Sequence, residues 1–566
     1  MTGSAATPRA GVGAEVDGRL PIVIGVTGHR DLRAADVPCY RRQIGEFFER
    51  LRQRYPSTPL LVISALAEGA DRLVAEVALE RGSRFVVPLP LEPRDYERDF
   101  PDSVSEFRAL LHRVAPERVF VWPRPAAVND SPWCDSAAER DHQYRAVGAF
   151  VAQQSHILLA IWDGVPNDSG VGTAAVVSLK LGRSNTSRAG SRTALDPDDS
   201  GPVFHVHAAR SGSDSGVAPH AEWLFAHDND LELFHTVCSR IDRFNAEAAR
   251  AHIRSQVPAA AASLLPESQA PTADRALATA FGCADRLAAH YQRITHRVLR
   301  LTLLLAALLA MIFEVYAEVL PLRVVPLAYL VCFALLTLVL IWHRRLDAQG
   351  RYLDYRALAE GLRVQFYWRL GGLSDNASSS YLRKQLDELR WIREALRATG
   401  AAPPPVAAHP DLALKWWIQD QATYYAAHAR LHEQRLQRLE RCSRLFLALG
   451  LLAAFSLVIF WQLMERWSTL HHWTVLIMGI APIGAALWEA YGERSGVRTQ
   501  GNQYARFATI FHRAEQFVGH LEQEPATPAR RHGELTLLRE LGREALIENA
   551  DWVRLLRDRP IALPKG

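Results

Sequence analysis

The sequence has few cysteines and methionines, and neither sign of charge is in large excess. Its six cysteines are scattered over 566 residues and form no Cys-x-x-Cys pair, so neither a disulfide framework nor a zinc site is predicted. Lysine and arginine total 65 against 61 acidic residues. Because this balance builds no strong positive field, we expect no nucleic acid partner. The mean hydropathy of −0.07 is an average over very different segments.

The start of the chain also lacks the apolar core of a signal peptide. Residues 1–20 are small and polar, and we expect a disordered lead-in with no signal peptide. A chain of 566 residues is too long for one hydrophobic core, so several domains are predicted.

Long apolar runs are the strongest feature of the second half. Each run has about 20 residues, enough to cross roughly 30 Å of hydrocarbon. Four such runs in two tight pairs are hard to bury in a soluble domain, so the sequence predicts two transmembrane hairpins, 301–342 and 445–488, in contact with a lipid bilayer. The four predicted spans are Leu301–Val319, Val324–Trp342, Leu445–Met464 and Leu470–Trp488.

Arginine is distributed unevenly around these hairpins. The turns hold only Arg323 and Arg466, whereas the other ends of the spans are rich in arginine. The positive-inside rule therefore predicts that both termini and the middle segment are cytoplasmic. The flanking arginines are Arg286, Arg293, Arg297, Arg300, Arg344, Arg345, Arg351, Arg435, Arg438, Arg441, Arg444, Arg494 and Arg498.

The membrane half has the pattern of a weak internal repeat, with an offset of roughly 145 to 150 residues. We expect a first helical unit at 276–400 and a second at 401–566, preceded by a linker at 255–275. Within the first span, Glu314 and Glu318 lie on one helical face. Either they line a pore or a helix contact, or the span ends near Val315.

The region 21–254 predicts a different architecture. Short apolar runs alternate with helical patterns, which is typical of a Rossmann-like α/β domain with a parallel sheet between helices. Residues 184–201 are polar and are predicted to be a flexible insertion. The predicted strands are 21–28, 59–66, 84–90, 118–122, 156–164 and 202–209.

Three strand-to-helix turns carry glycine and small polar residues. In a parallel sheet these turns meet at the carboxyl edge, where ligands bind. Small residues let the backbone approach a phosphate, and helix N-termini supply free N–H groups. We therefore predict a nucleotide site made by Gly25, Thr27, Gly28, His29 and Arg30 in the first turn, Ser64, Glu68, Gly69, Asp71 and Arg72 in the second, and Asp163, Gly170, Gly172 and Thr173 in the third.

These turns carry a family resemblance. The segments VIGVTGHRDL, LVISALAEGADRLVAEVALERGSRFVVPLP and GVGTAAVV resemble the SLOG superfamily of Rossmann-like domains. That group includes the DNA-processing protein A fold, the cytokinin-activating phosphoribohydrolases and the ligand domain of melastatin-type channels. The resemblance implies a nucleotide or ADP-ribose-type ligand. The phosphoribohydrolases have a glutamate where this chain has Val176, so binding without cleavage is the simpler expectation.

The membrane half resembles a second family. Tyr355–Trp368 and Glu540–Pro560 are similar to the SLATT module, a two-helix membrane unit that follows nucleotide-sensing domains in bacterial defence systems. The resemblance implies a protein of the bacterial inner membrane that forms pores or perturbs the bilayer after a nucleotide signal. Because four spans are too few to enclose a wide pore, a homo-oligomer is expected.

Three hypotheses for function follow. The leading one is a sensor–effector that binds a nucleotide-derived ligand and controls the membrane helices. The second is a membrane-tethered hydrolase with Glu68 or Asp71 as the acid/base group. A transporter is the third, for which only Pro326 and Pro482 hint at broken helices. No metal site and no catalytic residue are predicted beyond these.

Overall fold

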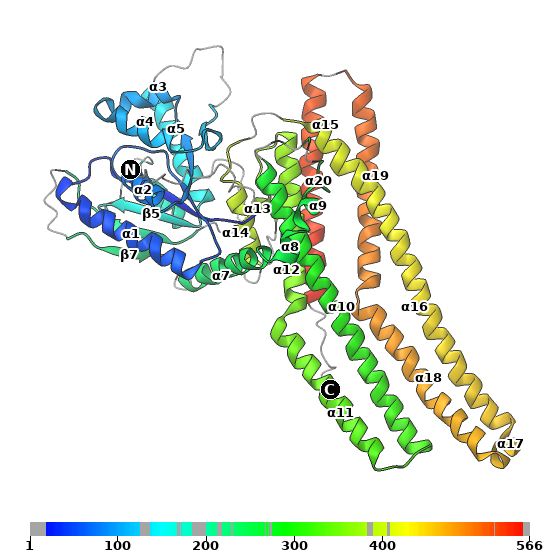
Figure 1. Cartoon of the computed structure of the whole chain (residues 1–566). Helices are drawn as coiled ribbons and strands as arrows, with labels where there is room; N and C mark the ends of the chain where they lie inside the picture. Colours follow the sequence, from blue (N-terminus) through cyan, green and yellow to red (C-terminus); the bar gives the residue numbers. More distant parts are fainter. Residues whose placement is uncertain are drawn as a thin grey trace, which may run out of the picture. The chain divides into compact units, whose positions relative to one another are not determined.

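The structure, a computed structural model shown in Figure 1, divides the chain into two compact units. The first comprises Met1–Ala284, Leu358–His409 and Ala545–Ile547, and the second comprises Asp285–Ala357, Pro410–Glu544 and Glu548–Gly566. Most of the predicted lead-in and of the predicted insertion lie outside the described residues. The described residues are 18–124, 136–166, 170, 172–183, 200–211, 218–227, 230–266, 268–269, 271, 274–381, 389–404, 408–525 and 527–557.

A seven-stranded sheet forms the centre of the first unit, with the order β4-β3-β2-β1-β5-β6-β7. All neighbours are parallel except β6 and β7. The order reverses between β1 and β5, which is the topological switch point where open α/β sheets bind ligands. The strands are β1 Ile22–Gly28, β2 Leu60–Ile63, β3 Arg84–Leu89, β4 Val119–Val121, β5 Ile157–Trp162, β6 Val203–His207 and β7 Ala221–Leu224.

The six predicted strands and the predicted parallel sheet are confirmed, and the structure adds a seventh strand at one edge that was not predicted. Strand β7 runs antiparallel to β6, with Val203 opposite Leu224. Its residues are exposed or half-buried. An edge strand covered on one side carries no continuous apolar run, so the pattern that revealed the inner strands is missing here.

Side-chain alternation along β1 divides the core into two layers. Ile22, Ile24 and Val26 pack on one face, whereas Val23 packs on the other. Helices α1 (Val37–Arg54), α2 (Ala70–Glu80), α4 (Val104–His112) and α7 (Asp230–Ala248) cover the first face. Helices α5 (Ala137–Gln154), α6 (Thr173–Lys180) and α14 (Arg390–Thr399) cover the second.

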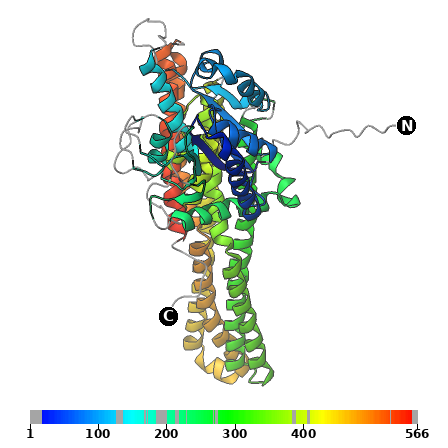
Figure 2. The same ribbon diagram turned by 90° about the vertical axis from the view of Figure 1, so that its left-hand side faces the viewer.

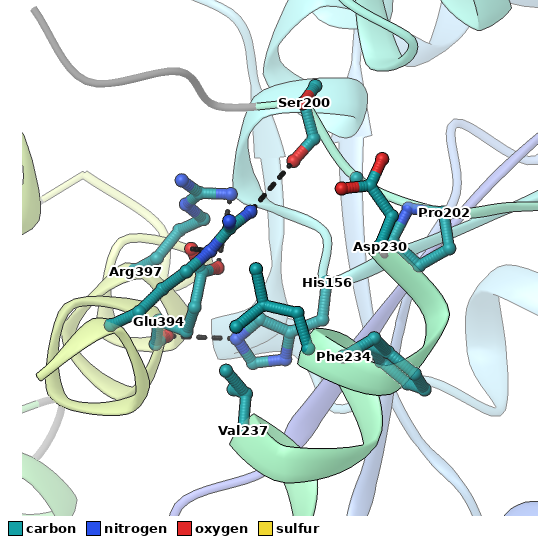
Figure 3. A pocket seen from close by; sticks show the side chains of 11 residues that line it. His156, Ser200, Pro202, Asp230, Phe234, Val237, Glu394 and Arg397 are labelled. Atoms are coloured by element: carbon teal, nitrogen blue, oxygen red, sulfur yellow. Dashed lines mark hydrogen bonds and ion pairs between the residues drawn. The ribbon is translucent and has the colours of Figure 1, made fainter. Parts of the chain in front are cut away.

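Helix α14 joins the sheet through His156 at its amino edge (Figure 3). The Nδ1 of His156 accepts the backbone N–H of Val23 at 3.0 Å, so its Nε2 carries the proton and donates to the carbonyl of Glu394 at 2.8 Å. The Glu394 carboxylate is paired with Arg397 at 3.1 Å. Burial lowers the pKa of His156 to about 4, against the raising effect of Glu394. A neutral histidine therefore connects helix and sheet.

The segment predicted as a linker, 255–275, is instead partly helical and packed. It contains α9 (Val257–Ala261), and Val257, Ala260 and Leu264 are buried. A Cβ at Gly282 would lie 2.8 Å from the carbonyl oxygen of Val257, so glycine permits a close backbone contact. This segment is rich in alanine and lacks a strong apolar pattern, so its composition indicated flexibility. Alanine is nevertheless the best helix former, and the segment is partly helical. The short helices of this unit are α3 (Pro93–Tyr96), α8 (Ala251–Arg254) and α13 (Ala377–Ser380).

Four helices in the described part of the chain are long and apolar enough to cross a membrane, which confirms the prediction of four spans. The third of these helices ends at Ile459, five residues before the predicted end at Met464. The four helices run side by side in Figures 1 and 2. Large apolar side chains such as Leu330 and Val458 are more than half exposed, as a lipid-facing surface requires. The helices of this part are α10 (Arg275–Glu318), α11 (Val324–Leu346), α12 (Ala348–Gly371), α15 (Pro410–Ala413), a π-helix (Leu414–Gln419), α16 (Asp420–Ile459), α17 (Trp461–Arg466), α18 (Ser468–Arg494), α19 (Val497–Gln523) and α20 (Pro528–Arg557).

Glycines let the apolar helices of the second unit approach one another. A Cβ at Gly484 of α18 would lie 2.8 Å from the Phe446 ring of α16. A Cβ at Gly479 would lie 2.9 Å from the Glu314 carboxyl group of α10. Small residues at such crossings are the usual means of tight helix packing in lipid. Glu314 therefore lies at a helix contact, one of the two readings that the sequence left open.

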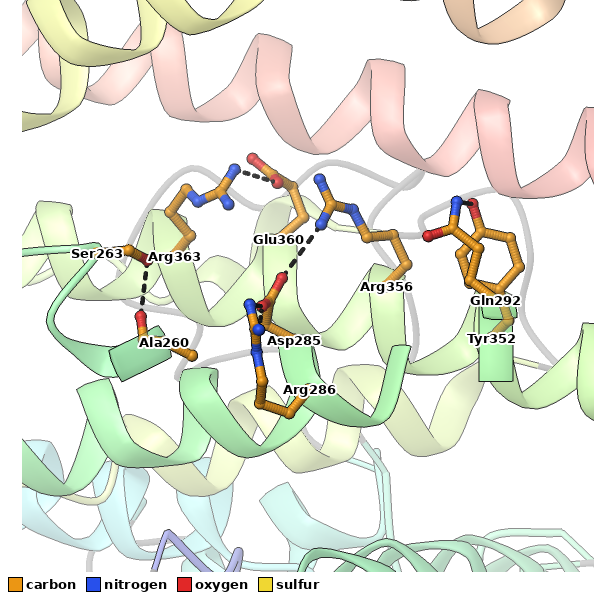
Figure 4. Close-up of polar contacts among 9 residues, drawn as sticks. All are labelled: Ala260, Ser263, Asp285, Arg286, Gln292, Tyr352, Arg356, Glu360 and Arg363. Carbon is orange, nitrogen blue, oxygen red and sulfur yellow. Dashed lines mark hydrogen bonds and ion pairs between the residues drawn. The ribbon is translucent and has the colours of Figure 1, made fainter. Parts of the chain in front are cut away.

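Beyond the apolar windows, α10 and α12 are joined by polar contacts. Arg356 donates to Asp285 at 3.3 Å, and the Gln292 amide donates to the Tyr352 hydroxyl at 3.3 Å (Figure 4). The equivalent helices of the second hairpin, α16 and α19, use aromatic contacts, with Tyr425 stacked on Phe507 at 4.9 Å. Aromatic contacts also join α10 and α12, since the rings of Tyr291 and Tyr355 are 5.9 Å apart.

Candidate functional site at the switch point

The carboxyl ends of β1 and β5 are joined by His29 and Asp163. The Nε2 of His29 accepts the backbone N–H of Asp163 at 3.0 Å, and it lies 3.1 Å from Oδ2 of the Asp163 carboxylate. Because Nε2 is an acceptor, the ring is neutral with its proton on Nδ1. Burial lowers the pKa of His29, which outweighs the raising effect of Asp163.

Asp163 is held as an anion by its neighbours. Its Oδ1 accepts the N–H of Val165 at 3.0 Å, and Arg210 donates from Nε to Oδ2 at 3.2 Å. Partial burial acts to raise the pKa of Asp163, but the Val165 hydrogen bond and the hydrogen bond and charge of Arg210 lower it overall. Arg210 follows β6, so three adjacent strands contribute to this group. Half of the Arg210 side chain is exposed to solvent.

Gly170 and Gly172, the described glycines between β5 and α6, have no close neighbour among the described residues. A Cβ added at Gly170 or Gly172 would meet nothing within 4 Å. Gly172 is the N-cap of α6 and has no side-chain cap, and φ is positive at both glycines. The first amide groups of α6, beginning at Thr173, are therefore at a helix N-terminus that favours a negative charge. The described glycines before α6 are therefore not explained by close packing against other described residues.

The glycines of the first two turns have a different role. A Cβ at Gly28 would lie 2.3 Å from the Ala70 Cβ, and one at Gly69 would lie 2.2 Å from the Arg30 carbonyl oxygen. The N–H of Ala70 donates to the His29 carbonyl at 3.0 Å. The two turns thus pack against each other, and the first amide of α2 already has a partner. Gly25 likewise approaches α5, since its Cβ would lie 2.9 Å from Val151, and Thr27 lies within β1 opposite Ala160.

The polar residues of the second turn form a closed network. Ser64 donates to Asp71 at 2.8 Å, and Arg72 donates to the Ser103 hydroxyl at 2.8 Å. Ser103 in turn donates to Glu68 at 2.6 Å. Burial raises the pKa of Asp71 to about 6, although the Ser64 hydrogen bond acts against it. The network orders the turn and leaves Asp71 enclosed.

Some residues of the site escaped the sequence prediction. The Arg30 guanidinium lies over the ring of Tyr144 at 5.6 Å, and the Tyr144 hydroxyl and Arg140 both bond to Asp99. Tyr144 and Arg140 come from α5, and no motif marks them. Arg210 was also missed, although it lies only three residues after β6, where the carboxyl-edge rule would have placed it.

Val176 faces a neighbouring helix. Its Cγ2 would lie 2.8 Å from a Cβ added at Gly148 of α5. The position that carries a glutamate in the phosphoribohydrolase motif is therefore a packing position here. Among the described residues, no group of three or more His, Cys, Asp or Glu side chains is arranged to hold a metal ion.

No family model, curated protein or solved structure matches the chain. The switch-point site is therefore described by its own geometry. It combines the N-terminus of α6 with a neutral histidine and with Arg210, which is half-exposed and paired with Asp163. This arrangement suits an anionic ligand, since guanidinium groups and free amides both favour phosphate oxygens.

Proposed function

We propose that the chain is a membrane-bound sensor–effector whose α/β unit binds a nucleotide-derived ligand at the switch point and thereby controls the transmembrane helices. In this proposal the α/β unit is SLOG-like, the helical hairpins are SLATT-like, and both termini lie in the cytoplasm of a bacterium. The helices act as a homo-oligomer that opens a pore or perturbs the bilayer in a defence response.

The position of Gly170 and Gly172 before α6 is the observation that carries the proposal. The packed glycines Gly28 and Gly69 are explained by contacts within the fold. Gly170 and Gly172 have no such contact with the described residues, and Gly172 is the N-cap of α6, which follows β5. A phosphate there would receive backbone N–H groups, with Arg30 and Arg210 supplying charge.

Control of the membrane requires that the ligand bind one state of the helices more tightly than the other. A difference of 1.4 kcal/mol changes the ratio of the two states about tenfold. The glycine-mediated contacts of Gly479 and Gly484 offer a place where packing can change, because a small shift between such helices exposes or covers polar groups.

A membrane-tethered nucleotide hydrolase is the second candidate. It is favoured by Asp71, whose pKa of about 6 would suit a general acid or base at neutral pH. Against it, Asp71 is buried behind Ser64, and Val176 replaces the glutamate of the resembling enzymes.

The two candidates are separated by incubating the purified full chain in detergent with nucleoside phosphates, ADP-ribose and cyclic dinucleotides. The sensor predicts a several-degree rise in melting temperature with one ligand, which is recovered intact. Arg210→Gln should remove the shift in melting temperature. Arg113→Gln changes an exposed arginine at the C-cap of α4 and should keep the shift. Release of products that Asp71→Asn abolishes would establish the hydrolase instead.

A further inference from the structure

A recess beside α5 continues from the turn that holds Gly170. It lies within the first unit, between the end of β4, the outer side of α5 and the segment around α13, and its volume is about 870 Å³. This volume falls within the range of small-molecule sites. We call it the α5 recess. Its described lining includes Phe120, Trp122, His142, Arg145, Phe150, Gln153, Gln154, Gly170, Gln365, Asn376 and Gly400.

One wall of the α5 recess is aromatic. The Trp122 and Phe150 rings are 5.0 Å apart, and those of Phe120 and Phe150 are 5.9 Å apart in an edge-to-face arrangement. All three side chains are only half-buried, although they adjoin the core of the sheet's second face. An aromatic surface left open in a pocket offers a platform on which a planar ring can stack.

Polar groups near this wall are of the kind that read a ring edge. Gln153 and Gln154 carry amide groups into the recess lining. The Gln154 oxygen is only 3.5 Å from the Asn376 amide, the limit of a hydrogen bond. Gln365, by contrast, is committed at both ends, to the N–H of Ala377 at 2.8 Å and the carbonyl of Asp375 at 3.2 Å. Gln154 is therefore already bound to Asn376, and Gln153 is the α5 glutamine in the recess lining that makes no hydrogen bond to another described residue.

Positive charge in the lining comes from Arg145 and Arg369. Arg369 is bound to Asp274 at 2.8 Å and to the Pro403 carbonyl at 3.0 Å. Arg145 is exposed and makes a 3.3 Å contact to the Asp141 carbonyl through Nε. The two Nη groups of Arg145 can therefore donate hydrogen bonds to a polar group of a ligand whose ring lies in the recess.

We propose that the α5 recess binds the base of the ligand, so that the ligand is a nucleotide with a planar heterocycle and not a simple phosphate or sugar phosphate. Gly170 lines the recess and lies two residues before Gly172, which begins α6. One molecule can therefore place its phosphate at the α6 N-terminus and its base against Trp122. This inference rests on the proposed function, and it adds the place where the base of the ligand binds.

The test compares probes that do and do not carry a base. Binding of AMP, GMP and ribose 5-phosphate to the full chain in detergent is measured by isothermal titration calorimetry. Trp122→Leu should lower the affinity for AMP and GMP about tenfold, the loss expected for a stacking contact. It should leave the affinity for ribose 5-phosphate unchanged. Phe150→Leu serves as a second variant if Trp122→Leu does not fold. Trp223→Leu, a half-buried tryptophan on the opposite face of the sheet, is the matched control and should change neither affinity.

The outcomes separate the two proposals. If Arg210→Gln weakens the binding of all three probes while Trp122→Leu and Phe150→Leu change the binding of none, the phosphate site stands and the base site is overturned. If the parent chain binds neither these three probes nor ADP-ribose nor a cyclic dinucleotide, both proposals fail. A selective loss of nucleotide binding in the recess variants establishes the base site.

Discussion

His29 connects the two central strands by accepting the backbone N–H of Asp163 at 3.0 Å. The contact crosses the switch point, because β1 and β5 are neighbours whose connecting helices lie on opposite sides. A neutral imidazole is required, since a protonated ring has no acceptor at Nε2. The position of Asp163, and through it that of Arg210, depends on this hydrogen bond.

Replacing His29 should test this dependence. His29→Ala leaves the Asp163 N–H without its partner, and we expect a loss of about 1–3 kcal/mol in the free energy of unfolding. His29→Gln provides an acceptor at a similar reach and should recover part of that loss. Urea unfolding of the full chain in detergent measures both. Equal destabilisation by the two variants would contradict the role of the hydrogen bond.

His156 predicts a pH dependence of stability. Its pKa is about 4 in the folded state, lowered by burial, against about 6.5 when unfolded. The unfolded chain therefore binds the proton more readily. The stabilising contribution is complete above pH 6.5 and is lost as the pH falls towards 4, by a total of about 3 kcal/mol.

Unfolding free energies between pH 7 and 5 check this sign. In His156→Gln the slope over that interval should be shallower than in the parent chain, whereas His112→Gln, an exposed histidine at the end of α4, should retain it. The pKa of Glu394 is lowered to about 2 by the surrounding arginines despite its burial, so its own contribution appears only below about pH 4.5. An unchanged slope in His156→Gln would be evidence against the assignment.

The packed and the open glycines should respond differently to alanine. Gly28→Ala places a Cβ 2.3 Å from that of Ala70, and overpacking of this kind costs about 1–3 kcal/mol. Gly172→Ala and Gly82→Ala meet no atom within 4 Å but have φ of +89° and +66°, and each should cost about 1 kcal/mol from the left-handed backbone. Of the latter two, only Gly172→Ala should weaken nucleotide binding. Equal binding by both would remove Gly172 from the site.

The second hairpin depends on Gly484. Leucine at this position would meet the Phe446 ring, at 2.8 Å from the Cβ alone, and should separate α16 from α18. A Cβ added at Gly519 on α19 meets nothing within 4 Å of the described residues, so Gly519→Leu is the control. Thermal unfolding in detergent should show a lower melting temperature for Gly484→Leu only. Matching melting temperatures would mean that the hairpin is not held by this contact.

The orientation of the hairpins has a direct test. The turn between α10 and α11 includes Leu320, which is exposed. A membrane-impermeant maleimide should label Leu320→Cys in intact bacterial cells and leave the parent chain unlabelled, because the positive-inside rule places Cys39 and Cys442 on the cytoplasmic side. Labelling of the parent chain in intact cells would indicate the opposite orientation of the hairpins.

Sequence patterns located the spans and the inner strands because each depends on local composition. The run Ile22–Gly28 is buried on both faces, and Leu445–Met464 is long enough to span a bilayer, so neither needs a distant partner to be recognised. Strand β7 lacks such a run and pairs only with β6. Helix α14 lies far along the chain from the sheet that it covers, and no local signal connects it to His156.

The site was predicted only in part for the same reason. Glycine in a turn indicates either close packing or space for a ligand, and the two cases differ only in what surrounds them. Gly28 and Gly69 meet backbone and Cβ atoms from other turns, whereas Gly170 and Gly172 meet none. The aromatic wall of Phe120, Trp122 and Phe150 is built from two separate elements, so sequence spacing gave no sign of it.

Ligand-controlled membrane permeability is the central claim, and efflux from liposomes tests it most directly. The full chain is reconstituted in vesicles loaded with a fluorescent dye. The nucleotide that raises its melting temperature is added to the outer solution, where it reaches the chains whose α/β units face outwards. The account predicts dye release with that nucleotide, no release with ribose 5-phosphate, and loss of the response in Arg210→Gln but not in Arg113→Gln. Release that is the same with and without nucleotide, or no release although the nucleotide binds, would contradict it.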